Sequence, residues 1–359
     1  MQVSCAAVSD RRVMSDRVMR AAVYRGKGDI GVEERPMPTV GPHDVLLEVS
    51  HCGVCGSDLH FVTEGWGQPG SVEGHEWSGT VVAIGSEVAL WKVGDAVVGG
   101  PMPRCGECEY CLAGRPSLCM GRSSPGTGDH SDGAFAEFTV ANERGLRRVP
   151  DGMPMRVAAL AEPLAVALHG LTRGGVAAGQ RVLVTGAGPI GTLSIAACKA
   201  RGVAEVVASE PHPKRRDLAE KLGATVVSPE DLESPVMPGE VVVEPFDVVL
   251  ECSGASRAME SGLAQLKRGG TLVMVGAGMQ RPKFDNNRIL LNELVITGAF
   301  IYDADGFERA LELLADPSFP SDLLIEADDV PLDGILGAIE GLHHGELAAK
   351  VMIVPVKDN

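Results

Sequence analysis

Long apolar runs, excess positive charge and the apolar core of a signal peptide are not seen in this 359-residue sequence. No stretch approaches the roughly 18 consecutive apolar residues that span a membrane, so we expect no membrane anchorage. Acidic residues outnumber basic ones by 48 to 32, which gives a net charge of -16. Such a surface repels phosphate backbones, and we expect no nucleic-acid partner. The N-terminus lacks the apolar core of a signal peptide, which predicts a cytoplasmic protein.

The length predicts two domains, and the pattern of strands and helices changes along the chain. Residues 1–18 have mixed charge and little periodicity, and we interpret them as a disordered leader or as sequence upstream of a start at Met14 or Met19. From there to about residue 150, short apolar runs separated by Gly, Pro and Asp predict an all-β, barrel-like domain. After Pro150, strands alternate with helices, which predicts βαβ units and a parallel sheet. Four prolines in residues 228–245 argue against a full crossover helix there.

Four of the nine cysteines lie within 15 residues. In a reducing compartment such a cluster indicates metal binding rather than disulfides. The C-x2-C-x2-C-x7-C spacing offers four thiolates, which suit a closed, tetrahedral structural zinc site. An iron–sulfur cluster is the competing interpretation of the short spacing, but the long final gap favours a zinc loop. The expected ligands of this zinc ion are Cys105, Cys108, Cys111 and Cys119.

The segment RVLVTGAGPIG places three glycines in G-x-G-x-x-G spacing between an expected strand and an expected helix. Gly186 permits the tight turn, Gly188 lets the backbone approach a pyrophosphate, and Gly191 lets the helix pack close to the strand. The N-terminus of the helix, which begins with Pro189 and Ile190, then faces the phosphates. In this context the motif predicts a dinucleotide-binding Rossmann domain.

An acidic residue ends the second strand of this domain. Glu210 lies 19 residues beyond Gly191, where a carboxylate can hydrogen-bond the ribose hydroxyls and repel a 2′-phosphate. We therefore expect NAD rather than NADP, although the basic residues that follow closely could contact a 2′-phosphate. The alternative role for Glu210 is to cap the following helix. For Cys252 the alternative interpretation is a residue packed inside this domain. Further cofactor contacts are expected at Arg215, Cys252, Ser253 and Gly276.

A second set of possible metal ligands is spread more widely, over HCGVCGSDLH, VEGHEWSG and LAEPLAVALHG. One Cys, one His and one carboxylate can hold a zinc ion and leave a fourth position open to water or substrate. An open zinc lowers the pKa of a bound hydroxyl group, so that an alcohol can lose its proton near neutral pH. A deprotonated alcohol gives up hydride readily, which links this metal to the dinucleotide site. Spacing alone does not prove the site, because these residue types are common.

At this point the sequence resembles a known family. CGVCGSDLH, GHEWSGTVVAIGSEV, VGDAVVGG, the four-cysteine segment, EPLAVALHG and VLVTGAGPIG follow one another in the order seen in zinc-dependent medium-chain alcohol dehydrogenases. The resemblance covers about residues 20–357. It implies a GroES-like β-barrel catalytic domain over residues 19–165 and 300–359. It also implies a Rossmann domain with a doubly wound parallel sheet over residues 166–299.

The resemblance implies the ligands of the catalytic zinc. Cys55 and His75 are similar to zinc ligands of the family, and either Glu76 or Glu162 is the third protein ligand. Glu162 stands where the simple-alcohol members have a third cysteine, and in this respect the sequence resembles the polyol and threonine dehydrogenase branch.

The resemblance also implies a proton path and a phosphate contact. Asp58 resembles the residue that orients His75, Ser57 the hydroxyl that accepts the substrate proton, and His60 the relay to solvent. Some members use a basic residue on the pyrophosphate where this chain has Gly56. Lys350 is a possible substitute for that contact.

Together these features predict a zinc-dependent alcohol dehydrogenase with two zinc ions and NAD per chain. It would oxidise a small secondary alcohol or polyol reversibly, as a homodimer or homotetramer. A primary alcohol or aldehyde substrate is the alternative within enzymes. A catalytically silent zinc protein that senses NAD(H) is the alternative from another class, but such a protein has no need of a proton path.

Overall fold

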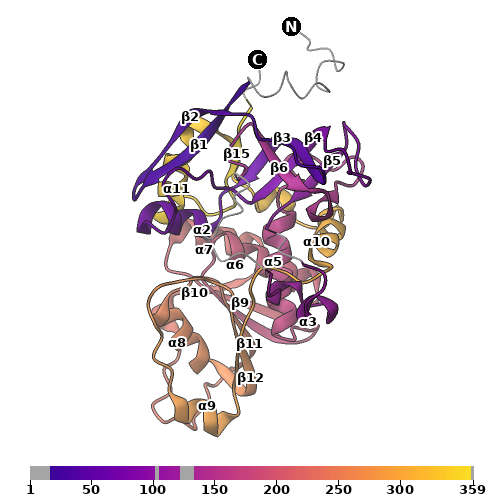
Figure 1. The fold of residues 1–359 in the computed structure, drawn as a ribbon. Helices are drawn as coiled ribbons and strands as arrows, with labels where there is room; N and C mark the ends of the chain where they lie inside the picture. Colours follow the sequence, from indigo (N-terminus) through magenta and orange to yellow (C-terminus); the bar gives the residue numbers. More distant parts are fainter. Residues whose placement is uncertain (1–16, 102–104, 122–132, 357–359) are drawn as a thin grey trace. The chain divides into compact units, whose positions relative to one another are not determined.

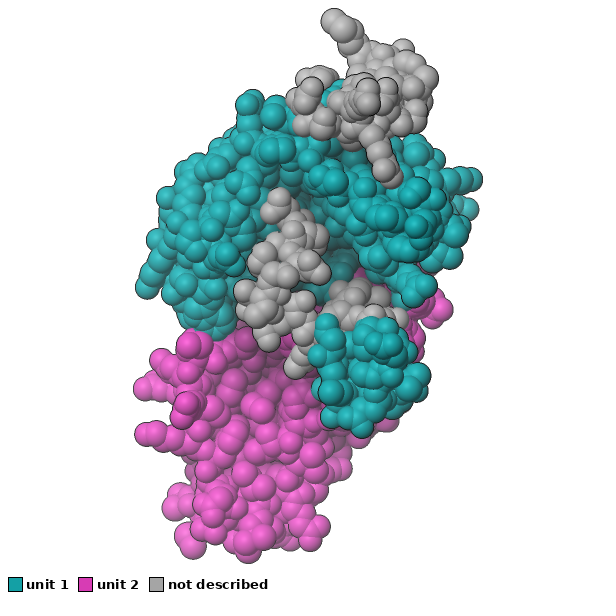
Figure 2. All heavy atoms as spheres, in the orientation of Figure 1, with its two compact units in different colours: residues 1–162, 327–343, 350–359 teal, residues 163–326, 344–349 magenta. Residues whose placement is uncertain are grey.

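A computed structural model describes residues 17–101, 105–121 and 133–356. The chain divides into two compact units, shown in different colours in Figure 2. Residues 1–16 of the expected leader lie outside the described residues, and the first strand already begins at Val18. Unit 1 comprises Met1–Glu162, Ala327–His343 and Lys350–Asn359, and unit 2 comprises Pro163–Glu326 and His344–Ala349.

Unit 1 is rich in strands, as its turn-rich sequence predicts. A seven-stranded sheet runs in the order β14-β15-β3-β4-β5-β7, with β6 also paired to β3, while β1 and β2 form a separate antiparallel pair (Figure 1). The central strand β3 contributes Val45, Leu46 and Leu47, which are fully buried. The strands are β1 (Val18–Gly26), β2 (Asp29–Pro36), β3 (Asp44–Gly53), β4 (Glu76–Ile84), β5 (Ala96–Gly99), β6 (Phe138–Asn142), β7 (Arg147–Arg148), β14 (Val330–Pro331) and β15 (Met352–Val354).

The helices of unit 1 are mostly single turns that follow strands. A short π-helix, His60–Glu64, directly continues α2. The α-helices are α2 (Gly56–Leu59), α3 (Glu109–Leu112), α4 (Met155–Ala158) and α11 (Ile335–His343), and α5 (Ala161–Arg173) begins at the last residues of unit 1.

Unit 2 is an alternation of strands and helices around a parallel sheet. Its six strands run in the order β10-β9-β8-β11-β12-β13. Successive strands are added in one direction from β8 to β10 and in the other from β11 to β13, so the strand order reverses between β8 and β11. The strands are β8 (Arg181–Thr185), β9 (Glu205–Ser209), β10 (Thr225–Val227), β11 (Phe246–Glu251), β12 (Leu266–Met274) and β13 (Val295–Gly298). The helices are α6 (Pro189–Ala200), α7 (Pro213–Lys221), α8 (Ser256–Ala264), α9 (Asn286–Asn292) and α10 (Gly306–Leu314).

The proline-rich segment between β10 and β11 contains only a single 3-10 turn, Pro229–Asp231, within residues 228–245, all of which are described. The expectation that no full crossover helix forms there is confirmed. Among the described residues, no helix is both long and apolar enough to cross a membrane.

The boundary after the Rossmann sheet differs from the expected one. We placed the return to the first domain at residue 300, but residues 300–326 belong to unit 2. The reason is contact with α5: Asp303 lies 3.2 Å from the imidazole of His169, and a side chain on Gly306 would contact Ala165 at 3.3 Å. The chain therefore returns to unit 1 only at Ala327.

Candidate metal centres and cofactor pocket

The end of β3 and the start of β4 bring three possible metal ligands together. Cys55 precedes α2, directly after β3, and His75 precedes Glu76, the first residue of β4. Gly53 and Glu76 are partners in the antiparallel register of the two strands. A sulfur, an imidazole nitrogen and a carboxylate oxygen of Cys55, His75 and Glu76 all lie within 4.8 Å of one another. This mixed donor set fits zinc with one position open.

Asp58 and Ser57 face the two nitrogens of the His75 ring. The buried Asp58 accepts the backbone N–H of Cys55 at 2.8 Å through Oδ2, while its Oδ1 lies 3.8 Å from Nδ1 of His75. That Oδ1 accepts no hydrogen bond from the described residues, which leaves it available to His75. Burial raises the pKa of Asp58 to about 6, although His75 opposes this rise. Ser57 Oγ lies 3.4 Å from Nε2, the nitrogen on the opposite side of the ring.

Glu162 and Lys350 are the other buried charged groups near these ligands. Burial raises the pKa of Glu162 to about 8, against the effect of His75, but Glu162 lies outside the three-ligand cluster. The ammonium group of Lys350 donates to Oε1 of Glu76 at 2.8 Å and to the carbonyl of Val54 at 3.0 Å, and lies 2.7 Å from Oε2 of Glu76. The sequence predicted only a phosphate contact for Lys350 and did not indicate its pairing with Glu76.

His60 is the first residue of the π-helix and contacts Glu64 and Trp66. Its Nδ1 is 2.8 Å from Oε1 of Glu64, and its ring stacks on Trp66 with the centroids 4.5 Å apart. The side chain of His60 is 23% exposed, so the ring is partly open to solvent. Trp66 therefore packs against the expected relay residue.

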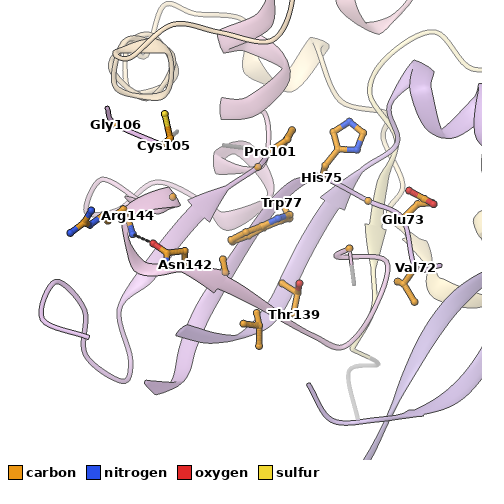
Figure 3. Close-up of a pocket in the computed structure, with 16 residues that line it drawn as sticks. Val72, Glu73, His75, Trp77, Pro101, Cys105, Gly106, Thr139, Asn142 and Arg144 are labelled. Carbon is orange, nitrogen blue, oxygen red and sulfur yellow. Dashed lines mark hydrogen bonds between the residues drawn. The ribbon is translucent and has the colours of Figure 1, made fainter. Parts of the chain in front are cut away.

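A cavity of about 860 Å³ in unit 1 has His75 in its wall. In Figure 3 the indole of Trp77 lies between the His75 ring and the turn that carries Asn142 and Arg144. The backbone N–H of Arg144 donates to the Asn142 side chain at 3.2 Å, which fixes this turn. The polar side chain of Thr139 also lines the cavity.

The four cysteines of residues 105–119, a segment that we call the zinc lobe, converge as the sequence predicts. Their sulfurs lie within 4.8 Å of one another, and Cys105 Sγ is 3.6 Å from that of Cys119 and 4.0 Å from that of Cys111. The backbone N–H groups of Cys105 and Cys108 donate to the sulfurs of Cys119 and Cys105 at 3.3 Å. A hydrogen bond from the backbone of Met120 contributes most to lowering the pKa of Cys108 to about 6. Thiolates held in this way suit a structural zinc ion.

The glycine motif has the geometry that its spacing predicts. Gly186 has a φ of +87°, and a Cβ on Gly191 would lie 1.9 Å from the carbonyl oxygen of Gly186, so no side chain fits there. Gly188 precedes α6, whose first residue is Pro189. A Cβ on Gly188 would approach only Arg215, at 3.9 Å, which leaves its backbone accessible to a phosphate.

A cavity of about 570 Å³ in unit 2 opens on this motif. Glu210 lines it, with its carboxylate fixed by the backbone N–H groups of Ala187 at 2.7 Å and His212 at 2.9 Å. Each carboxylate oxygen keeps a second lone pair for another donor. The expected residues that line this cavity are Gly186, Gly188, Pro189, Glu210, Arg215, Cys252 and Ser253.

Some of the expected cofactor residues do not line this cavity, and some residues that line it were not predicted. Ile190, Gly191 and Gly276 are not among the residues that line the cavity. The sequence did not point to Arg257 and Ser261 on α8, which do line it. A helix that directly follows a strand end at the carboxyl edge of a parallel sheet was the signal that could have indicated them.

Comparisons with known proteins agree with this geometry. Residues 41–151 match the alcohol dehydrogenase GroES-like domain, and residues 189–316 match the zinc-binding dehydrogenase family. Sorbitol dehydrogenase of Macaca fascicularis is 36% identical over 348 residues, covering 92% of this chain and 94% of its own length. L-threonine 3-dehydrogenase of Rhizobium etli (strain CIAT 652) is 34% identical over 345 residues, covering 93% and 98%.

A solved structure shows the same two-domain fold. A zinc-binding dehydrogenase of Sinorhizobium meliloti 1021, bound to NADP, has a TM-score of 0.82 and 32% identity, covering 95% of this chain and 100% of its own. This chain belongs to the zinc-dependent medium-chain alcohol dehydrogenase family, in the branch that includes sorbitol and threonine dehydrogenases. It is an oxidoreductase that uses zinc and a nicotinamide cofactor. The predicted fold class and zinc-dependent alcohol dehydrogenase activity are confirmed.

Proposed function

We propose that this chain oxidises a small secondary alcohol or polyol to the ketone, reversibly, with NAD and two zinc ions per chain. The observation that carries the proposal is the cluster of Cys55, His75 and Glu76 with Ser57 beside it. We assign Glu76 as the third protein ligand, because its oxygen lies within 4.8 Å of the other two donors. Glu162 is buried nearby but lies outside this cluster, so we do not assign it as a ligand.

The residues around this cluster supply the proton chemistry. When bound, zinc lowers the pKa of the substrate hydroxyl and NAD takes up the hydride. Ser57, on the Nε2 side of His75, would accept the hydroxyl proton as it releases its own proton toward His60. His60, which is partly open to water, passes the proton to solvent, and Asp58 keeps the His75 ring oriented. In carbonyl reduction the same groups deliver the proton.

The substrate class follows from the cavity and from the relatives. A volume of about 860 Å³ beside His75 is in the range of small-molecule sites, and Asn142 and Thr139 supply polar groups for additional hydroxyls. Two relatives are named for sorbitol, a polyol, and for threonine, a secondary alcohol. These observations favour a secondary alcohol or polyol over a primary one.

We assign NAD as the preferred cofactor because the Glu210 carboxylate is fixed in the wall of the unit 2 cavity. Its charge there repels a 2′-phosphate, whereas its oxygens accept ribose hydroxyls. Arg215 in the same wall attracts phosphate, and one relative was solved with NADP. The ratio of kcat/KM between NAD and NADP therefore tests directly whether Glu210 selects the cofactor.

We also propose a homodimer or homotetramer in the cytoplasm. β13 is an edge strand of the six-stranded sheet, and the nearby side chains of Leu290, Leu291, Val295 and Phe300 are exposed. An exposed apolar edge strand is a template for pairing with a second copy. A reducing compartment is required because the ligand thiols have to stay reduced to hold metal. Light scattering that gives the mass of one chain would contradict the oligomer.

The decisive experiment compares two neighbouring cysteines. Cys55→Ala should reduce the zinc content from two ions to one and abolish NAD reduction with a panel of alcohols, because a zinc ligand is lost. Cys52→Ala is the matched control: this fully buried thiol lies outside the ligand cluster, so zinc content and turnover should persist. An active, fully metallated Cys55→Ala variant would contradict the proposed catalytic zinc. A zinc-replete wild type that turns over no alcohol would favour an NAD(H) sensor.

A further inference from the structure

A single buried residue in unit 2 holds the loop after β11 through its carboxylate and the loop after β12 through its main-chain carbonyl. Glu251 is the last residue of β11, and its side chain is fully buried. Its Oε1 accepts the backbone N–H of Ser253 at 2.8 Å and the Ser253 hydroxyl, and the N–H of Gly254 lies 3.1 and 3.2 Å from its two oxygens. Its main-chain carbonyl accepts the N–H groups of Val275 at 2.9 Å and Gly276 at 2.8 Å. One residue therefore fixes two loops at the carboxyl edge of the sheet.

These loops also pack directly against the glycine motif. A Cβ on Gly186 would lie 2.7 Å from the Cβ of Ser253, so the glycine turn rests on this side chain. A Cβ on Gly276 would lie 2.3 Å from the nitrogen of Gly254, so the loop after β12 packs equally closely against the Ser253–Gly254 loop. Because there is no spare space between the three loops, a shift of Ser253 would move Gly186 as well.

The loop held by Glu251 is a wall of the unit 2 cavity. Ser253 and Ala255 line this cavity together with Gly186 and Gly188. The loop follows β11, and the glycine turn follows β8, the two strands between which the strand order reverses. Dinucleotides bind at this point of a doubly wound sheet.

A carboxylate is unfavourable at a fully buried position unless several donors satisfy it. Burial raises the pKa of Glu251, and the donors of Ser253 and Gly254 oppose this rise. A glutamine of the same shape would place its amide nitrogen, a donor, at the position of Oε2, 3.2 Å from the nitrogen of Gly254, so that two donors would face each other. The donor of Gly254 therefore favours a carboxylate over an amide at this position.

We propose that Glu251 is a positioning residue for the nicotinamide cofactor: it holds the Ser253–Gly254 loop against Gly186 and so shapes the cavity in which the dinucleotide binds. This inference rests on the proposed function, because it requires that the cavity takes a dinucleotide. Glu251 itself lies beneath the loop and does not line the cavity.

The test is the dissociation constant of NADH, measured by fluorescence titration of the zinc-loaded protein. Glu251→Gln should raise this constant about tenfold, because its amide nitrogen would face the Gly254 N–H and displace the loop. An unchanged constant in a folded Glu251→Gln protein would overturn the proposal. A wild type that binds no NADH would instead refute the nicotinamide cofactor, so the two failures are distinguishable.

A matched control lies at the other end of the same strand. Asp247, near the start of β11, accepts the backbone N–H of Arg181 at 2.7 Å and pairs with Lys267. Asp247→Asn removes a comparable interaction far along the strand from the cavity. It should lower the melting temperature and leave the NADH dissociation constant unchanged. Equal rises of that constant in both variants would reduce Glu251 to a merely structural residue.

A second measurement applies even if Glu251→Gln does not fold. In wild-type protein the amide hydrogens of Ser253 and Gly254 are held by Glu251, so they should exchange slowly before cofactor is added and more slowly still with NADH. Rapid exchange without NADH, or no further protection with it, would overturn the proposal.

Discussion

The buried ion pair between Lys350 and Glu76 allows a quantitative prediction. Lys350 is 1% exposed and Glu76 is fully buried, and the ammonium group contacts both carboxylate oxygens. Lys350→Met keeps the length and apolar stem of the side chain but leaves a buried carboxylate without its cation. Removal of one partner of a buried pair costs about 3–5 kcal/mol, so we expect a loss of this size in the free energy of unfolding of unit 1.

The assay can follow unit 1 by itself. The three tryptophans of the chain, Trp66, Trp77 and Trp91, all lie in unit 1, so their fluorescence during urea unfolding reports on this unit. The destabilisation should increase after chelation of zinc, because a bound metal ion supplies part of the missing positive charge. Compared in zinc-free protein, the double variant Lys350→Met/Glu76→Gln should recover most of the loss, since no unpaired charge remains and no metal ligand is tested.

A surface pair in the same unit is the control. Arg25 pairs with Glu33 at 2.8 Å, and both side chains are exposed, so Arg25→Met should leave the unfolding midpoint nearly unchanged. If Lys350→Met were as mild as Arg25→Met, or if the double variant were no more stable than Lys350→Met, the charge-pair reasoning would be refuted.

Three further predictions concern separate parts of the chain. Cys108→Ala should lose the lobe zinc ion and lower the melting temperature, because the lobe has little apolar core; an unchanged melting temperature with full metal content would contradict the structural site. Glu210→Ala should narrow the ratio of kcat/KM between NAD and NADP, since the charge that repels a 2′-phosphate is gone, and an unaltered ratio would show that Glu210 does not read the ribose. Arg148 donates to Asp95 and thereby lowers its pKa below the usual 3.8, so this pair stabilises the fold fully above about pH 4 and the stabilisation is lost as the pH falls through the folded-state pKa. Arg148→Met should therefore reduce the acid sensitivity of thermal unfolding between about pH 5 and pH 2, and an identical pH profile would contradict this coupling.

Local spacing explains why much of the fold was predictable. The glycines of the cofactor turn and the four lobe cysteines act through neighbours in sequence, so their spacing already determines the turn geometry and the convergence of the sulfurs. The alternation of strands and helices after Pro150 likewise follows from periodicity, which predicts the parallel sheet of unit 2.

The proposed ligands of the catalytic zinc were predictable only as a set of candidates. Cys55, His75, Glu76 and Glu162 were all named from the resemblance, but sequence spacing could not decide between the two carboxylates. The register of β3 with β4 brings Glu76 into the cluster, and this is a long-range property of the sheet.

The sequence by itself determined the motifs whose members lie close along the chain: the dinucleotide turn, the four-thiolate lobe and the order of strands and helices. Tertiary structure alone decided that Lys350 pairs with Glu76, 274 positions away, that Glu251 holds the loops beside the glycine turn, and that residues 300–326 belong to unit 2. The physical reason is that backbone turns and periodic faces depend on neighbouring residues. The burial of a charge and the choice of its partner depend instead on which distant segments pack together.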